Sequence, residues 1–169
     1  MRALLAAAPP HVAICLAIQA FAGVHTAELL RLAWHDLERR SGHIEITAKQ
    51  AKPQRRLIPI LPNLAAWLRL ASHNGNERLW TRSSNRYFAA QKQAASKAGV
   101  SWKAKALRHI FISYRLAKTK DIAAVALEAG NSARMIFAHY RELCTETEAA
   151  EWFGILPASE ATHVVRMTA

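Results

Sequence analysis

The stretch from Lys105 to Tyr140 constrains the fold most strongly, because its apolar residues recur at the spacing of a helix. Apolar or aromatic residues fall at offsets 0, 3, 4 and 7 twice in succession: Leu107, Ile110, Phe111 and Tyr114, then Ile122, Val125, Ala126 and Ala129. This pattern predicts two consecutive amphipathic helices. Asp121 is placed to cap the second helix and Gly130 to end it. A third short helix would then carry the Tyr140 hydroxyl back toward Arg108.

The remaining sequence predicts further helices and one small sheet. Residues 43–47 (HIEIT) and 55–60 (RRLIPI) alternate like the two strands of a hairpin, and residues 79–81 are expected to add a brief third strand. Helices are expected from near Pro10 to Gly23, from Thr26, from Pro62, and over residues 85–98. We therefore expect a mainly α-helical fold with a small antiparallel β-sheet. Residues 1–157 are expected to form one domain, and residues 158–169 a disordered tail.

The charge of the chain favours a polyanionic partner. The 169 residues include 23 Lys and Arg against 12 acidic residues, which gives a formal net charge of +11. Nucleic acid is the partner that this surplus favours, and an ordinary basic, solvated surface is the alternative. Two distant cysteines and a short apolar run over residues 12–21 indicate a cytoplasmic, nucleoid-associated protein with no membrane partner. Because no metal-ligand motif or phosphate loop occurs, we expect no metal and no cofactor.

Two segments of the chain resemble the catalytic boxes of the tyrosine recombinases, the phage-integrase family. In the second box, Arg108-His109 and Gly130 match the family pattern, and Tyr140 stands nine residues after position 131. The first box is matched by five residues: Gly23, Glu28, Leu29, Trp34 and Asp36. The resemblance runs from about residue 20 to residue 157 and implies the catalytic-domain fold of that family. The N-terminal DNA-arm domain of the family has no counterpart in the sequence.

The resemblance also implies a reaction on double-stranded DNA during recombination or integration. Tyr140 would attack a phosphodiester and leave a 3′-phosphotyrosine, while Arg108 would stabilise the pentacoordinate phosphate. In the family, a lysine in the hairpin loop protonates the leaving oxygen. Lys52 matches that position better than Lys49, which is the second candidate.

Three positions depart from the family pattern. His25 stands where the family has a catalytic Arg, Lys105 where it has His, and Asn131 where it has His or Trp. A guanidinium is always charged and grips two phosphate oxygens, whereas an imidazole is mostly neutral at pH 7. Losing one such donor costs roughly 100- to 1,000-fold in rate. We therefore expect impaired cleavage, and the alternative is a degenerate integrase domain that binds DNA or a partner subunit without cutting.

Further residues are expected to bind DNA or a second copy of the chain. The candidate DNA contacts are Lys49, Lys52, Arg86, Lys92, Lys97, Lys103 and His109. Thr145 and Glu148 form a capping box that predicts a terminal helix carrying Trp152 and Phe153. This helix is expected either to pack on its own domain or to join a homo-oligomer on DNA.

Overall fold

The computed structural model describes residues 1–47, 55–140 and 144–158, and it is mainly helical with a two-stranded antiparallel sheet. The expected fold class is therefore confirmed. The elements in chain order are α1 (Arg2–Ala7), α2 (Pro10–Ala22), α3 (Thr26–Leu29), α4 (His35–Glu38), β1 (His43–Ile46), β2 (Arg56–Pro59), α5 (Pro62–Leu68), α6 (Ser84–Lys97), α7 (Ala106–Thr119), α8 (Ile122–Ala129), α9 (Ala133–Tyr140) and α10 (Glu146–Phe153).

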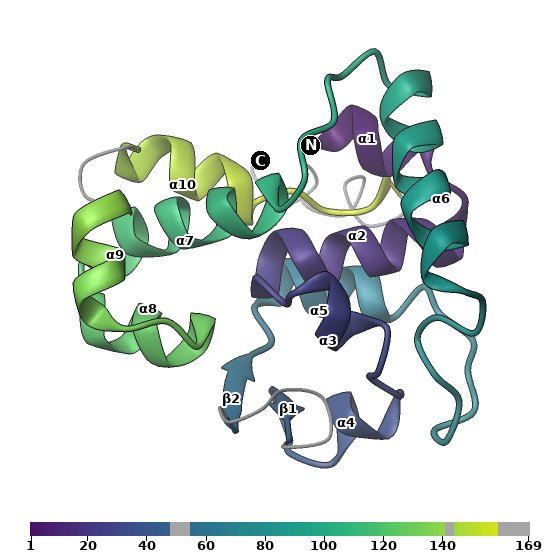
Figure 1. The fold of residues 1–169 in the computed structure, drawn as a ribbon, viewed down its shortest axis with the longest axis horizontal. Coiled ribbons are helices and arrows are strands. Elements are labelled where there is room, and N and C mark those ends of the chain that lie inside the picture. Colours follow the sequence, from purple (N-terminus) through teal and green to yellow (C-terminus); the bar gives the residue numbers. More distant parts are fainter. Residues whose placement is uncertain (48–54, 141–143, 159–169) are drawn as a thin grey trace, which may run out of the picture.

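Helix α2 lies at the centre of the molecule, with α5 and α7 packed against it (Figure 1). All of its residues from Val12 to Ala22 are buried, as expected for a helix that is apolar on every side. Gly23 ends the helix with a φ of 63°, a conformation that suits glycine. A Cβ at Gly23 would lie 2.2 Å from the Phe111 ring of α7. The close contact between the end of α2 and the middle of α7 therefore requires glycine there.

The hairpin forms as the sequence predicted, but the third strand does not. His43 pairs with Pro59 and Ile46 with Arg56, and the alternation buries Ile44, Ile46 and Ile58. Residues 79–81 were expected to form a strand, and this prediction is wrong. The segment instead bonds to the irregular residues after α3, through the Trp34 N–H to the Glu77 carbonyl and the Leu79 N–H to the Leu32 carbonyl. Among the described residues, the pairing is limited to one isolated antiparallel bridge, Ala33 with Arg78, which lies outside the sheet.

The predicted series of three helices between Lys105 and Tyr140 is confirmed as α7, α8 and α9. The Asp121 side chain accepts a hydrogen bond from the Ala124 N–H at 2.9 Å, and Gly130 ends α8 with a φ of 65°. The helix from Thr26 is shorter than expected. It stops at Leu29, and the chain turns where the Ala33 N–H donates to the Asp36 carboxylate at 2.9 Å, before α4 begins.

The terminal helix α10 packs on its own chain. Its capping box between Thr145 and Glu148 forms as predicted. The Trp152 indole donates to the Ala20 carbonyl at 3.0 Å, and the Phe153 ring meets Phe111 edge-on with centroids 6.3 Å apart. In this single chain, the two aromatic residues considered for a subunit interface therefore contribute to the core. The expected tail, apart from residue 158, lies outside the described residues.

Within the described ranges, no helix is long and apolar enough to cross a bilayer.

Candidate functional site

The guanidinium of Arg108 is held by the ends of two helices. Arg108 lies in the first turn of α7 and is only 6% exposed. Nη1 donates to the Gly23 carbonyl at 2.6 Å, and Nη2 donates to the Ala129 carbonyl and to Asn131 Oδ1, the latter at 2.9 Å. Both backbone carbonyls lie at helix C-termini, where the helix dipole favours a cation. These bonds fix the side chain and use three of its five N–H groups, and the other two can serve a ligand.

Arg108 keeps its charge despite its burial. Burial lowers its pKa from 12.5 to about 10, and the nearby charge of Arg56 acts in the same direction. Glu28 and Tyr140 oppose this lowering of the pKa. A pKa of about 10 leaves the guanidinium protonated at pH 7. The site therefore offers a fixed, desolvated cation, the arrangement in which an anionic group is bound most strongly.

Tyr140 lies against the residue that follows Arg108 in sequence. Its hydroxyl oxygen is 2.6 Å from Nδ1 of His109, and the two rings stack with centroids 5.6 Å apart. Tyr140 is the last residue of α9 and is 7% exposed, whereas His109 is exposed. Burial raises the pKa of the phenol, and the Arg108 charge partly opposes this rise. Tyr140 is therefore a neutral phenol with an imidazole nitrogen in hydrogen-bond contact.

His25 precedes α3 as its N-cap, where it forms a reciprocal capping box with Glu28. The His25 N–H donates to the Glu28 carboxylate at 2.9 Å. Burial lowers the pKa of the imidazole, and the positive charge of Arg108 lowers it further. Glu28 raises this pKa, while Arg56 and Lys105 add to the lowering. At pH 7 His25 is neutral, so it brings no permanent charge to the site.

Lys105 and Asn131 reach the same site from two sides. Lys105 immediately precedes α7, is exposed, and has a φ of 63°, which is strained for a residue with a Cβ. Such strain costs about 1–3 kcal/mol and occurs most often where function requires it. Asn131 directs its carbonyl oxygen to Arg108, so its amide N–H groups point away from the guanidinium. The side chain that replaces His or Trp of the family pattern thus orients Arg108.

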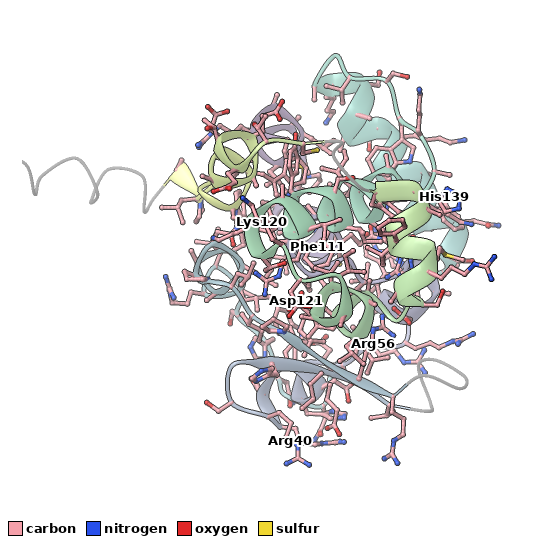
Figure 2. All side chains as sticks on the ribbon, turned by 90° about the vertical axis from the view of Figure 1, so that its left-hand side faces the viewer. Arg40, Arg56, Phe111, Lys120, Asp121 and His139 are labelled. Atoms are coloured by element: carbon pink, nitrogen blue, oxygen red, sulfur yellow. The ribbon has the colours of Figure 1, made fainter. Side chains whose placement is uncertain are left out.

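Arg56 is the site residue that the sequence reasoning missed. It donates to both oxygens of Glu28, at 2.9 and 2.7 Å, and through Nε to the Glu128 carbonyl at 3.0 Å. These bonds join the hairpin to α3 and α8, and Figure 2 shows Arg56 between the hairpin and α8. Strand alternation was the available signal, because it puts Arg56 on the same face as the buried Ile58.

The predicted DNA contacts divide into four groups. Arg86, Lys92 and Lys97 are exposed along α6, which Figure 1 shows at the opposite end of the molecule from α8 and α9. Lys103 is exposed in the segment before α7. His109 is exposed, and its ring contacts Tyr140. Lys49 and Lys52 lie outside the described residues.

The described residues contain no cluster of three or more His, Cys, Asp or Glu side chains that could hold a metal ion. Both cysteines are free. Arg108 bonds to Asn131 and interacts electrostatically with Tyr140 and His25. Lys105 also interacts electrostatically with His25, and His109 contacts Tyr140. These side chains combine a buried cation, a phenol and an imidazole, which is a set suited to binding and attacking a phosphate.

One solved structure with this fold is the crystal structure of XerA recombinase. It aligns with 99% of this chain at a TM-score of 0.64 and 18% sequence identity. The chain spans 63% of the length of the XerA chain. No family model matches the sequence, and no curated protein matches it. The chain therefore shares the fold of the part of XerA recombinase with which it aligns.

Proposed function

We propose that this chain is the catalytic domain of a DNA strand-breaking and rejoining protein of the tyrosine-recombinase type, with impaired cleavage. The observation that carries the proposal is the 2.6 Å contact between the Tyr140 hydroxyl and His109 Nδ1, one residue from the buried Arg108. The fold shared with XerA recombinase and the net charge of +11 support a DNA substrate.

Arg108 binds the scissile phosphate in this proposal. Its guanidinium is already oriented by three oxygen acceptors, so little reorganisation is needed when negative charge builds up on the phosphate. The two N–H groups outside these bonds, one on Nε and one on Nη1, remain as donors for phosphate oxygens. The exposed Lys105 adds a second positive charge at the entrance of the site.

Tyr140 is the nucleophile and His109 accepts its proton. In the tautomer with the proton on Nε2, the Tyr140 O–H donates to Nδ1, and the phenol oxygen becomes nucleophilic as that proton moves. The attack forms a bond between the phenol oxygen and phosphorus and breaks the bond to the 5′ oxygen. That oxygen takes a proton from the hairpin lysine, for which Lys52 is the first candidate and Lys49 the second. The phosphotyrosine keeps the bond energy, so the strand can be rejoined without a nucleotide cofactor.

His25 is the reason we propose impaired cleavage. A neutral imidazole contributes one donor where a guanidinium would contribute a charge and two donors. Removing one such group lowers the rate by at least about 100-fold. Asn131 compensates in part, because it holds Arg108 in place through its carbonyl oxygen.

A second candidate function is binding to DNA, or to a partner subunit, without cleavage. The observation that favours it is the enclosure of the two central groups. Tyr140 is 7% exposed, and three N–H groups of Arg108 already bond to the protein. A phosphate would then contact the exposed cations of the surface and never reach the phenol.

The test is covalent trapping on a nicked duplex. After cleavage the short leaving strand dissociates, so the strand cannot be rejoined and the protein–DNA adduct accumulates. The wild-type chain should give little adduct, and His25→Arg should give at least about 10-fold more. Tyr140→Phe should abolish the adduct both in the wild-type chain and in combination with His25→Arg. His109→Ala should lower the adduct formed by His25→Arg, because the phenol loses its proton acceptor. Efficient trapping by the wild type would contradict the assigned effect of His25. Duplex binding without adduct in every variant would favour the second candidate.

A further inference from the structure

A pocket of about 620 Å³ opens beside Arg108. Apart from His25, Lys105 and Arg108, its lining residues have no role in the steps proposed above. It is lined by the start of α3, the first half of α6 and the segment that leads into α7, and we refer to it as the α3–α6 pocket. Its volume lies within the range of about 300–1,000 Å³ that is typical of small-ligand sites. Arg108 borders both this pocket and the Tyr140 site.

Two aromatic side chains line the α3–α6 pocket from separate segments. Phe88 of α6 is 46% exposed, although an aromatic ring of that size is normally buried. Trp102 is half-buried in the segment before α7. Leu30 and Val24 complete an apolar surface between them. Such a surface favours a flat, apolar group that can stack on a ring.

The polar residues of the pocket point to a nucleotide as the occupant. His25, Lys105 and Arg108 all line it, and no acidic side chain does so in the described part of the chain. An apolar pocket that carries cations and no carboxylate is complementary to a group that is both aromatic and anionic. A peptide helix would satisfy the apolar surface but would leave these charges without a partner.

Buried amides supply hydrogen bonding within the same pocket. Gln19 is 6% exposed and Gln91 3% exposed. The Gln19 carbonyl accepts from the Tyr87 hydroxyl at 2.7 Å and from the Gln91 amide at 2.9 Å, and the Gln19 amide donates to the Thr26 hydroxyl at 2.8 Å. None of these bonds uses the Gln91 carbonyl oxygen. A base edge presents the N–H groups that such a carbonyl accepts.

We propose that the α3–α6 pocket holds one unpaired base of the bound DNA, whose backbone phosphate lies on Arg108 and Lys105. The inference rests on the proposed DNA-binding function and adds a preference for sites with an unstacked base. Phe88 and Trp102 stack on the base, and Gln91 contacts its edge. A fully paired duplex leaves the pocket empty, and it therefore binds through phosphate contacts alone.

The experiment compares two labelled duplexes that differ by one unpaired adenine, with affinities measured by fluorescence anisotropy. The unpaired adenine should tighten binding about 10-fold, within the range that stacking of one base on aromatic side chains provides. Phe88→Ala should remove this gain and leave the affinity for the paired duplex unchanged. Trp102→Ala should do the same. Phe137→Ala is the matched control, since Phe137 of α9 is 52% exposed but does not line the pocket, and the gain should persist.

The two proposals fail in different ways in this experiment. Equal affinity of the wild type for both duplexes would overturn the base-binding inference and leave the DNA-binding function standing. Failure to bind either duplex would overturn both proposals. A gain that survives in Phe88→Ala and Trp102→Ala would show that the unpaired base binds elsewhere. Thermal melts of the variants establish that each is folded before its affinity is interpreted.

Discussion

The buried ion pair between Glu28 and Arg56 makes a sharp prediction for the variant Glu28→Gln. The two side chains are 7% and 6% exposed, and they share two hydrogen bonds of 2.9 and 2.7 Å. The Glu28 oxygen at 2.7 Å also accepts from the His25 N–H. Glutamine has the same shape but replaces one acceptor oxygen with a donor. The amide NH2 therefore faces an Arg56 N–H in either orientation, and in one orientation it also faces the His25 N–H. The buried guanidinium also loses its counter-charge.

Breaking a buried pair from one side costs about 3–5 kcal/mol, because the remaining charge stays desolvated. We expect about 4 kcal/mol, which at a urea dependence of about 2 kcal/mol per molar lowers the unfolding midpoint by about 2 M. The matched control is Glu45→Gln. Glu45 pairs with Arg39, whose side chain is 50% exposed, at 3.3 Å. An exposed pair contributes only about 0–1 kcal/mol.

Urea unfolding of the wild type and the two variants, followed by circular dichroism, measures the difference. We expect a large midpoint shift for Glu28→Gln and a shift of less than about 0.5 M for Glu45→Gln. Equal, small shifts in both variants would refute the view that the Glu28–Arg56 pair anchors the hairpin to α3.

Three further predictions follow from the same structure. Trp152→Ala should lower the free energy of unfolding by about 3–5 kcal/mol without changing the sedimentation coefficient, because the indole bonds to the Ala20 carbonyl and contacts the Tyr114 ring at a tilt within its own chain. A shift toward monomer with unchanged stability would instead place α10 in a subunit interface. Stability should fall as the pH drops below 6.5, because the pKa of His25 is lowered in the folded chain and the unfolded chain therefore binds the proton first. Stability should fall again below pH 4.5, where Glu28 becomes protonated. Burial raises the pKa of Glu28, but the hydrogen bond and charge of Arg56 outweigh burial and lower it in the folded chain. His25→Asn should flatten the first step in urea midpoints measured across this pH range, and an unchanged step would contradict its assignment to His25. The affinity for a paired duplex should weaken by orders of magnitude between about 50 and 200 mM salt, because neutralised phosphates release counterions; an affinity flat in salt would argue against a phosphate interface.

The helices could be read from the sequence because their signals are local. Apolar spacing, the Asp121 cap and the terminal glycines each depend on a few neighbouring residues, and α7, α8 and α9 formed as expected. The strand predicted at residues 79–81 failed because strand pairing is not local. Leu79 found a backbone partner at Leu32, which no periodicity within residues 79–81 reveals.

The sequence supplied candidate residues for the site, but their contacts could not be predicted from it. Spacing brought Tyr140 toward the start of α7, yet its contact with His109 depends on how α9 packs on α7. Asn131 stands where the family pattern has His or Trp, and only the structure shows that its carbonyl orients Arg108. Arg56 was missed because a charged residue in a short strand is normally solvated. Its burial depends on Glu28, which lies 28 positions away.

The most direct test of the account is to map the covalent link in the adduct that His25→Arg forms with the nicked duplex. Nuclease digestion followed by peptide mass spectrometry identifies the modified residue and the DNA end attached to it. We expect one modified peptide, carrying a nucleotide on Tyr140 through its 3′ phosphate. A link to any other residue, a 5′ link, or no adduct despite tight duplex binding would contradict the assignment of Tyr140, His109 and Arg108 as a strand-cleaving site.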